Sequence, residues 1–318
     1  MPLRPSVLFA APFPGGLRDD IAPLLAVAGE AGAPLGADLS SLDAAAIRAL
    51  VTFGTLQTDA ALMDRLPNLG LICCYGSGYE GIDINEAAKR GITVTYSPAV
   101  NAAAVADLAM GLLLAVNRHI VTADKFVRDG FWHGQASVRM PIVRGLTGRR
   151  VGIFGLGAIG AKIAARAAGF EMEIAYHNRL RKPDVPYIFH ETLQSLANWA
   201  DVLMIAVRAD ASNRHAVNAD VMRALGPDGV LVNISRGSVI DEQAMVALLQ
   251  SGELGSVGLD VYEHEPTCPT RSRRSRMSCW HRISAAARWR HSRQCRVLLL
   301  QTSRHFSRAK PPLRQFRK

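Results

Sequence analysis

Residues 149–170 read RRVGIFGLGAIGAKIAARAAGF, and this stretch decides the fold of the second half of the chain. A hydrophobic run that favours a strand leads into Gly155, Gly157 and Gly160, and a helix-like segment follows. About twenty residues after the glycines begin, EMEIAYHN (171–178) predicts a second strand. A strand, a Gly-x-Gly-x-x-Gly turn, a helix and another strand form the context in which this motif binds a dinucleotide.

Each glycine of the motif has its own physical task. Gly155 permits the tight turn, Gly157 lets the backbone approach a diphosphate, and Gly160 lets the helix pack closely on the strand. The amides around Ala158 and Ile159, together with the helix dipole, would then face the anion. The alternative is a glycine-rich turn that holds no ligand.

The end of the second strand indicates which dinucleotide would bind. It reads YHNRLRK (176–182), so Asn178 stands where an NAD site usually places an acid, and Arg179, Arg181 and Lys182 follow. An acid would repel a ribose 2′-phosphate, whereas arginine pairs with it. The sequence therefore predicts NADP(H) as the preferred cofactor, with NAD(H) as the second choice and a solvated basic loop as the alternative without a ligand.

Further strands and a helix continue the alternation in the second half of the chain. Strands are predicted in ADVLMIAV (200–207), GPDGVLVNIS (226–235) and GSVGLDV (255–261), and a helix in SVIDEQAMVALLQSGEL (238–254). This alternation is typical of a parallel sheet covered by helices. Such sheets bind their ligands at the carboxyl edge of the strands.

Four residues at these strand ends are candidates for the same edge as the glycine turn. Arg236 directly follows an apolar strand, and a buried cation there needs an anion such as a substrate carboxylate. A structural ion pair is the alternative for Arg236. We count Val207, Ser235 and Asp260 among the candidate cofactor-binding residues.

The first hundred residues show the same alternation and predict an α/β unit of their own. Strands are expected in VLFAA (7–11), RALVTF (48–53), LGLICCYG (69–76) and ITVTYSP (92–98), and helices in DAALMDRL (59–66) and DINEAAKRG (83–91). Asp59 is a predicted N-cap and Gly91 a predicted C-cap. Residues 101–117 predict one long helix, too apolar for a surface and too short to span a bilayer, which we expect to be buried between domains or at a subunit interface.

Length and composition agree with two domains. The 318 residues are 49% hydrophobic and 20% charged, which excludes a disordered or fibrous chain. We expect a cytoplasmic protein, because no apolar run reaches membrane length and the start lacks a convincing signal peptide. The five cysteines form no CxxC and no Cys/His cluster, so no metal site is predicted.

The net charge of +10 is concentrated at one end of the chain. Residues 267–318 contain 13 Arg, 2 Lys and no Asp or Glu, so the preceding 266 residues hold 22 basic and 27 acidic residues. All 27 glycines lie at or before Gly258. The basic tail could in principle bind nucleic acid, but aromatic residues are sparse there, so we consider nucleic-acid binding the weaker alternative.

Five motifs together resemble the D-isomer-specific 2-hydroxyacid dehydrogenases, and within that family the NADPH-dependent glyoxylate, hydroxypyruvate and hydroxyphenylpyruvate reductases. They are CCYGSGYEGIDI (73–84), RGITVTYSPAVNAAAVADLAMGLLLAVNR (90–118), RRVGIFGLGAIG (149–160), LGPDGVLVNISRGSVIDEQAMVALLQSGEL (225–254) and GLDVYEHEP (258–266). The resemblance implies an α/β protein of two Rossmann-like domains with doubly wound parallel sheets. These are a flavodoxin-like substrate-binding domain at 1–98 and an NAD(P)-binding domain at 99–266, followed by the atypical tail 267–318.

The resemblance also implies roles for individual residues. The amides of Ser77 and Gly78 would hold the carboxylate of a small 2-keto acid such as glyoxylate or hydroxypyruvate. Arg236 would bind that carboxylate and the keto oxygen. Asp260 would orient the nicotinamide, and Glu265 would tune a catalytic histidine. The family also implies a homodimer.

The catalytic histidine is where this chain departs from the family. A segment like PHIGSAT is expected somewhat under twenty residues after Glu265, but the chain reads CWHRISAAARWRHSR (279–293), with His281 near the expected place. We interpret residues from Thr267 onward as read out of frame. If His281 cannot serve as the acid, the chain would be a catalytically impaired NADP(H)-binding protein.

Overall fold

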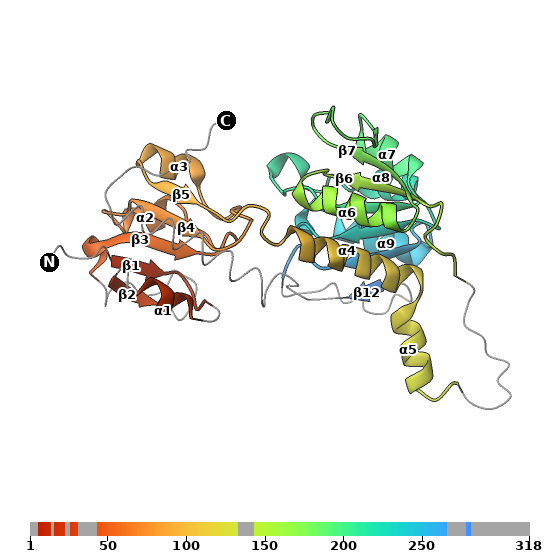
Figure 1. The fold of residues 1–318 in the computed structure, drawn as a ribbon, viewed down its shortest axis with the longest axis horizontal. Coiled ribbons are helices and arrows are strands. Elements are labelled where there is room, and N and C mark those ends of the chain that lie inside the picture. Colours follow the sequence, from red (N-terminus) through yellow and green to blue (C-terminus); the bar gives the residue numbers. More distant parts are fainter. Residues whose placement is uncertain are drawn as a thin grey trace. The chain divides into compact units, whose positions relative to one another are not determined.

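The computed structural model describes residues 6–13, 16–22, 26–30, 43–132, 143–265 and 278–280 (Figure 1). The chain divides into two compact units, and the change from the first to the second lies between Asn101 and Ala102. His281 lies outside the described residues.

The first unit is built on a parallel sheet with strand order β2-β1-β3-β4-β5, the flavodoxin-like order. Its strands are β1 (Ser6–Phe9), β2 (Ala26–Glu30), β3 (Ile47–Thr52), β4 (Leu71–Cys74) and β5 (Thr93–Thr95). Its helices are α1 (Leu17–Ile21), α2 (Ala60–Asp64) and α3 (Ile84–Lys89), with a 3-10 turn at Ala44–Ala46. The four predicted strands and two predicted helices are all present.

The predicted helix ends are also found. The side chain of Asp59 accepts a hydrogen bond from the Leu62 amide at 3.0 Å and so caps α2. Gly91, just beyond α3, has a φ of +69°, the left-handed conformation that glycine adopts most easily after a helix.

The second unit contains a parallel sheet with strand order β12-β11-β10-β9-β6-β7-β8. Its strands are β6 (Arg150–Phe154), β7 (Glu173–His177), β8 (Ile188–Phe189), β9 (Val202–Ile205), β10 (Val230–Asn233), β11 (Ser256–Leu259) and β12 (Ser278–Trp280). Its helices are α4 (Ala102–Asn117), α5 (Ile120–Arg128), α6 (Ala158–Gly169), α7 (Leu193–Trp199), α8 (Ala219–Leu225) and α9 (Glu242–Ser251). The strand order reverses between β6 and β9, which is the switch point of a dinucleotide-binding sheet.

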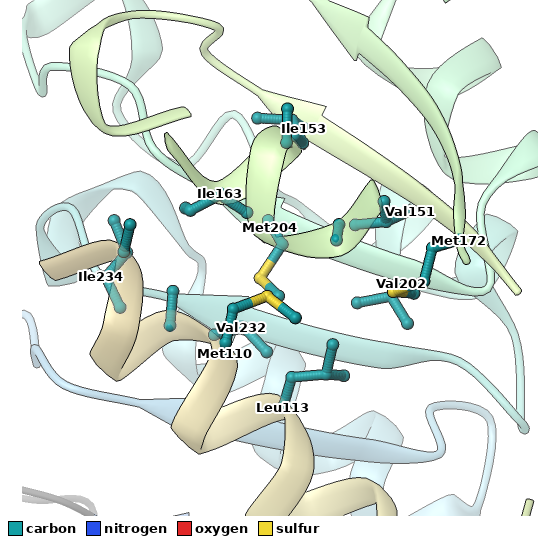
Figure 2. Packing of buried hydrophobic residues seen from close by; sticks show 14 of the residues in the cluster. Met110, Leu113, Val151, Ile153, Ile163, Met172, Val202, Met204, Val232 and Ile234 are labelled. Carbon is teal, nitrogen blue, oxygen red and sulfur yellow. The ribbon is translucent and has the colours of Figure 1, made fainter. Parts of the chain in front are cut away.

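Helices cover both faces of the second sheet, which explains why its strands are hydrophobic throughout. On one face α4 and α6 pack on the strands, and Figure 2 shows Met110 and Leu113 of α4 among strand residues such as Met204 and Val232. The other face carries α7, α8 and α9. A strand buried on both sides cannot alternate with polar residues, so these strands appear as continuous apolar runs.

The long apolar helix predicted at 101–117 is α4, and it is buried on the sheet of the second unit. Gly258 of β11 lies beneath it, where a Cβ would come within 3.1 Å of the Leu112 Cβ. Among the helices of the described residues, none has by itself the length and hydropathy to cross a membrane. Helices α4 and α5 meet that test only as a pair, across a bend of 59°.

Arg149 fastens the amino edge of the second sheet. Its guanidinium donates to the Asn117 side chain at the end of α4. It also donates to the carbonyls of Asp201 at 3.1 Å and Asp228 at 3.3 Å, just before β9 and β10. Arg150 adds an ion pair to Asp201 at 3.1 Å. These contacts lie at the amino ends of the strands, so the carboxyl edge is left for ligands.

Candidate active site

The glycine turn lies between β6 and α6, at the switch point. Gly155 has a φ of +100°, and a Cβ there would lie 2.7 Å from the Val207 nitrogen. A Cβ on Gly160 would lie 2.1 Å from the Gly155 carbonyl oxygen. A Cβ on Gly157 would meet nothing within 4 Å. Packing therefore requires Gly155 and Gly160 to be glycines, whereas Gly157 borders open space that a ligand can approach.

The amino end of α6 suits an anion. Gly157 is its N-cap, and no side chain caps the helix there. The first amide seen to bond within the helix is that of Ala161, which donates to the Gly157 carbonyl at 2.9 Å. The amides before it, including those of Ala158 and Ile159, have no acceptor inside the helix by its geometry. Together with the helix dipole they form a ready site for a diphosphate.

The basic loop after β7 is tied to the glycine turn. The Asn178 Oδ1 accepts a hydrogen bond from the Leu156 amide at 2.7 Å, so this side chain reaches the turn directly. Arg179 is exposed, and its guanidinium lies 3.8 Å from Asp210. Arg181 is also exposed. Both arginines are therefore solvent-exposed in the loop that begins at Asn178.

Asn233, which the sequence analysis did not single out, organises the next strand end. This fully buried residue accepts from the amide and hydroxyl of Ser235, both at 2.9 Å, and donates to the Arg236 carbonyl at 2.9 Å. Its own carbonyl accepts from the Asp260 amide at 3.0 Å. The signal that could have revealed it is an asparagine at the end of an apolar strand, because a buried amide needs several partners.

The turn after Arg236 packs directly on the segment that follows β11. A Cβ on Gly237 would lie 1.9 Å from the Tyr262 carbonyl carbon, so only glycine permits this approach. The half-buried Arg236 donates to the Ser235 carbonyl at 2.7 Å. Glu265 is exposed, and its carboxylate accepts from the Tyr262 amide at 3.0 Å. The structure therefore brings the Arg236 turn and the 260–265 segment together at one edge of the sheet.

A cluster around Glu263 holds that segment in place, and the sequence analysis missed it. Glu263 pairs with Arg214 at 2.6 Å and with His215 at 3.0 Å. Its amide donates to the buried Glu242 carboxylate at 2.7 Å, and burial raises the pKa of Glu242. His215 lies in a turn, and its contact with Glu263 joins that turn to the segment after β11.

His177 is the last residue of β7 and is half-buried, with its Nδ1 2.9 Å from the His190 carbonyl.

In the first unit, Ser77 and Gly78 lie in the loop after β4. This loop presses on the loop after β3, where a Cβ on Gly54 would lie 1.9 Å from the Gly78 carbonyl oxygen. The Ser77 hydroxyl donates to the Asn101 side chain at 3.2 Å.

Three aromatic rings gather at the same carboxyl edge of the first sheet. Phe13 and Phe53 stack at 4.3 Å between ring centroids, and Tyr75 meets Phe13 edge-on at 5.5 Å. These residues follow β1, β3 and β4 and form an aromatic cluster packed on the core of the first unit, and Tyr75 lies two residues before Ser77.

Residues 110–279 match the family model for the D-isomer specific 2-hydroxyacid dehydrogenase NAD-binding domain. The chain belongs to this family. It is 40% identical over 236 residues to hydroxyphenylpyruvate reductase of Plectranthus scutellarioides, which covers 74% of each chain. It is 42% identical over 223 residues to 2-ketogluconate reductase of Gluconobacter oxydans, covering 70% of this chain and 71% of the relative.

Solved structures agree with the fold of this 2-hydroxyacid dehydrogenase. A 2-hydroxyacid dehydrogenase from Ketogulonicigenium vulgare matches with a TM-score of 0.89 and 35% identity over 98% of both chains. The NADPH-dependent glyoxylate/hydroxypyruvate reductase of Sinorhizobium meliloti, solved with NADP and malonate, matches with a TM-score of 0.88 and 34% identity, covering 95% of this chain and 93% of that one. The predicted family, the parallel α/β fold and the assignment as an oxidoreductase are confirmed.

Proposed function

We propose that this dehydrogenase uses NADPH to reduce a small 2-keto acid to a D-2-hydroxy acid. The observation that carries the proposal is the uncapped amino end of α6 at Gly157, with Asn178 and two exposed arginines beside it in place of an acid. The relatives' names support the substrate class, since they include glyoxylate/hydroxypyruvate and hydroxyphenylpyruvate reductases.

In the proposed reaction the first unit binds substrate and the second binds NAD(P). NADPH, when bound, supplies the hydride that the keto carbon receives. The amides of Ser77 and Gly78 hold the substrate carboxylate, and Arg236 pairs with that carboxylate and stabilises negative charge that develops on the keto oxygen. Asp260 orients the cofactor's amide. Val207 and Ser235 line the cofactor site at the ends of their strands.

The keto oxygen also needs a proton, which a general acid must donate. A general acid contributes about 10²–10⁴-fold to such a reaction. Glu265 is proposed to tune a histidine, and His281 is the residue near the family's position. A chain that binds NADPH without turnover is therefore the second candidate, favoured by the replacement of the PHIG-like segment.

Turnover is tested by following NADPH oxidation with glyoxylate, hydroxypyruvate, 2-ketogluconate and hydroxyphenylpyruvate. The natural chain is compared with one whose sequence after Pro266 is restored to the alternative reading frame. Activity in the natural chain supports the proposal directly. Activity only in the restored chain supports the impaired candidate, and failure of both chains to bind NADPH contradicts the assignment of the cofactor.

The preference for NADPH is tested with Asn178→Asp. Aspartate can still accept from the Leu156 amide, but it places a negative charge where the 2′-phosphate would lie. We expect the Kd for NADPH to rise by about tenfold or more while NADH binding is retained, measured by fluorescence titration. Asn218→Asp, which adds the same charge at the N-cap of α8, is the matched control.

We also propose a cytoplasmic homodimer. Helix α5 and the residues after it expose large apolar side chains, namely Ile120, Val121, Val127, Phe131 and Trp132. Trp132 is 71% exposed, and an apolar group of this kind is typical of a surface that pairs with another protein.

A further inference from the structure

Tyr176 of β7 makes an unusual pair of hydrogen bonds. Its side chain is fully buried, and the ring lies 5.4 Å from that of Phe189 in β8. Its hydroxyl accepts from the Lys182 amide at 2.8 Å and donates to the Lys182 carbonyl at 3.2 Å. One core hydroxyl thus satisfies both main-chain groups of a residue six positions ahead and closes the chain between them into a loop.

The loop 178–182 is therefore held at both ends by polar bonds. At its start, the Asn178 side chain bonds the Leu156 amide of the glycine turn at 2.7 Å. At its end, Lys182 bonds the Tyr176 hydroxyl.

Between these two ends of the loop, side-chain packing contributes little to its stability. The side chain of Arg179 is 86% exposed and Leu180 is 81% exposed. Arg181 is exposed as well. The Arg179–Asp210 pair, at 3.8 Å and open to solvent, is of a kind worth little. The shape of the loop accordingly depends on its two ends.

We propose that Tyr176 is a positioning residue for cofactor selection, and that its hydroxyl fixes the loop so that Arg179 and Arg181 are held ready for a 2′-phosphate. This inference rests on the proposed function. A loop that is already ordered loses less conformational entropy when it binds, so the anchor strengthens recognition without touching the ligand. Loss of the Tyr176 hydroxyl should not change the binding of the nucleotide's diphosphate, because the glycine turn holds the diphosphate.

The test is Tyr176→Phe, which removes the hydroxyl and keeps the buried ring. The probes are 2′,5′-ADP and 5′-AMP, which differ only in the 2′-phosphate, and binding is measured by calorimetry. For Tyr176→Phe we expect the Kd of 2′,5′-ADP to rise about tenfold and that of 5′-AMP to change less than twofold. The Michaelis constant for NADPH should rise by a similar factor to the Kd of 2′,5′-ADP. The Michaelis constant for NADH should change as little as the Kd of 5′-AMP.

Tyr187→Phe is the matched control, because Tyr187 is a half-buried tyrosine of the neighbouring segment that packs on the same hydrophobic cluster. It should leave both Kd values unchanged. Arg179→Met should by itself lower the affinity for 2′,5′-ADP. Adding Tyr176→Phe to Arg179→Met should lower this affinity by a smaller factor than Tyr176→Phe does in the natural chain, because the hydroxyl would act through the arginine.

Two results would overturn the inference. One is a Tyr176→Phe variant that keeps the natural ratio of the two Kd values, and the other is an equal loss for both probes, which would mean general damage. Should the variant not fold, amide exchange of the natural chain decides: the Lys182 amide must be protected, and rapid exchange there would refute the anchor. If the natural chain shows no preference for 2′,5′-ADP, the proposed function fails instead.

Discussion

Gly160 is the residue at which the packing of α6 on the glycine turn depends on the absence of a side chain. In Gly160→Ala the new Cβ would meet the Gly155 carbonyl oxygen at 2.1 Å, so the turn or α6 must move. We expect NADPH affinity to fall at least tenfold and Tm to decrease, measured by titration and by thermal unfolding.

The control for this substitution is Gly169→Ala, at the other end of the same helix, where a Cβ meets nothing within 4 Å. It should raise stability by about 0.5–1 kcal/mol and leave NADPH binding unchanged. Equal behaviour of the two variants would show that the turn is not closely packed.

Glu242 predicts a pH dependence of stability. Its pKa is raised above the ordinary 4.5 by burial, which the hydrogen bond from the Glu263 amide only partly offsets. The folded state therefore holds this proton more tightly than the unfolded state does, so the contribution to stability is greatest below pH 4.5 and is lost as the pH rises through the folded pKa.

Glu242→Gln keeps an acceptor for the Glu263 amide and removes the charge. Its Tm should exceed that of the natural chain at pH 7–8 and converge with it toward pH 4.5. A Tm difference that does not vary with pH would contradict this account.

Among individual residues, the sequence predicted those whose role depends only on the neighbouring stretch of chain. Gly155 and Gly160 could be assigned because their roles follow from the turn that contains them. The bond from Leu156 to Asn178 could not, because it joins positions 22 apart whose meeting depends on how β6 and β7 pair. The Glu263 cluster was missed for the same reason, since its partners come from the 214–215 loop and from α9.

Helix α4 is held on the second sheet by an extensive buried face. Leu113 is fully buried against the strands of the second sheet (Figure 2). Leu113→Ala should lower the free energy of unfolding by about 2–5 kcal/mol through lost contacts and a cavity, measured by denaturant unfolding. Leu180→Ala, the same change at an 81% exposed position, should shift it by less than about 0.5 kcal/mol. A small effect at Leu113 would mean that α4 is not packed as described.

Among the elements, the sequence predicted those with a strong pattern and missed the short or weak ones. Continuous apolar runs identified β6, β9, β10 and β11, and the long apolar helix α4 was equally clear. Strand β8 has only two residues, Ile188 and Phe189, and β2 reads AVAGE, so neither gives a run long or regular enough to predict a strand. Their pairing with β7 and β1 is set by the sheet around them.

At the scale of the whole molecule, the apolar surface of α5 and the residues after it predicts self-association. Val127 is 56% exposed, and Val127→Asp should place a charge in the proposed contact between two copies. We expect the natural chain to elute at twice its monomer mass in size-exclusion chromatography with light scattering, and the variant to shift toward the monomer. Leu180→Asp, which adds the same charge at an exposed apolar residue outside this surface, should leave the mass unchanged. A monomeric natural chain at micromolar concentration would contradict the dimer.

The contacts of Arg149 stabilise the second sheet at residues that take no part in nucleotide binding. Arg149 joins the end of α4 to the starts of three strands, at the opposite edge of the sheet from the glycine turn. Substitutions that change the stability of the sheet and substitutions that change nucleotide selectivity can consequently be made at different residues. A surface attachment or fusion placed near this edge would leave the nucleotide's approach unobstructed.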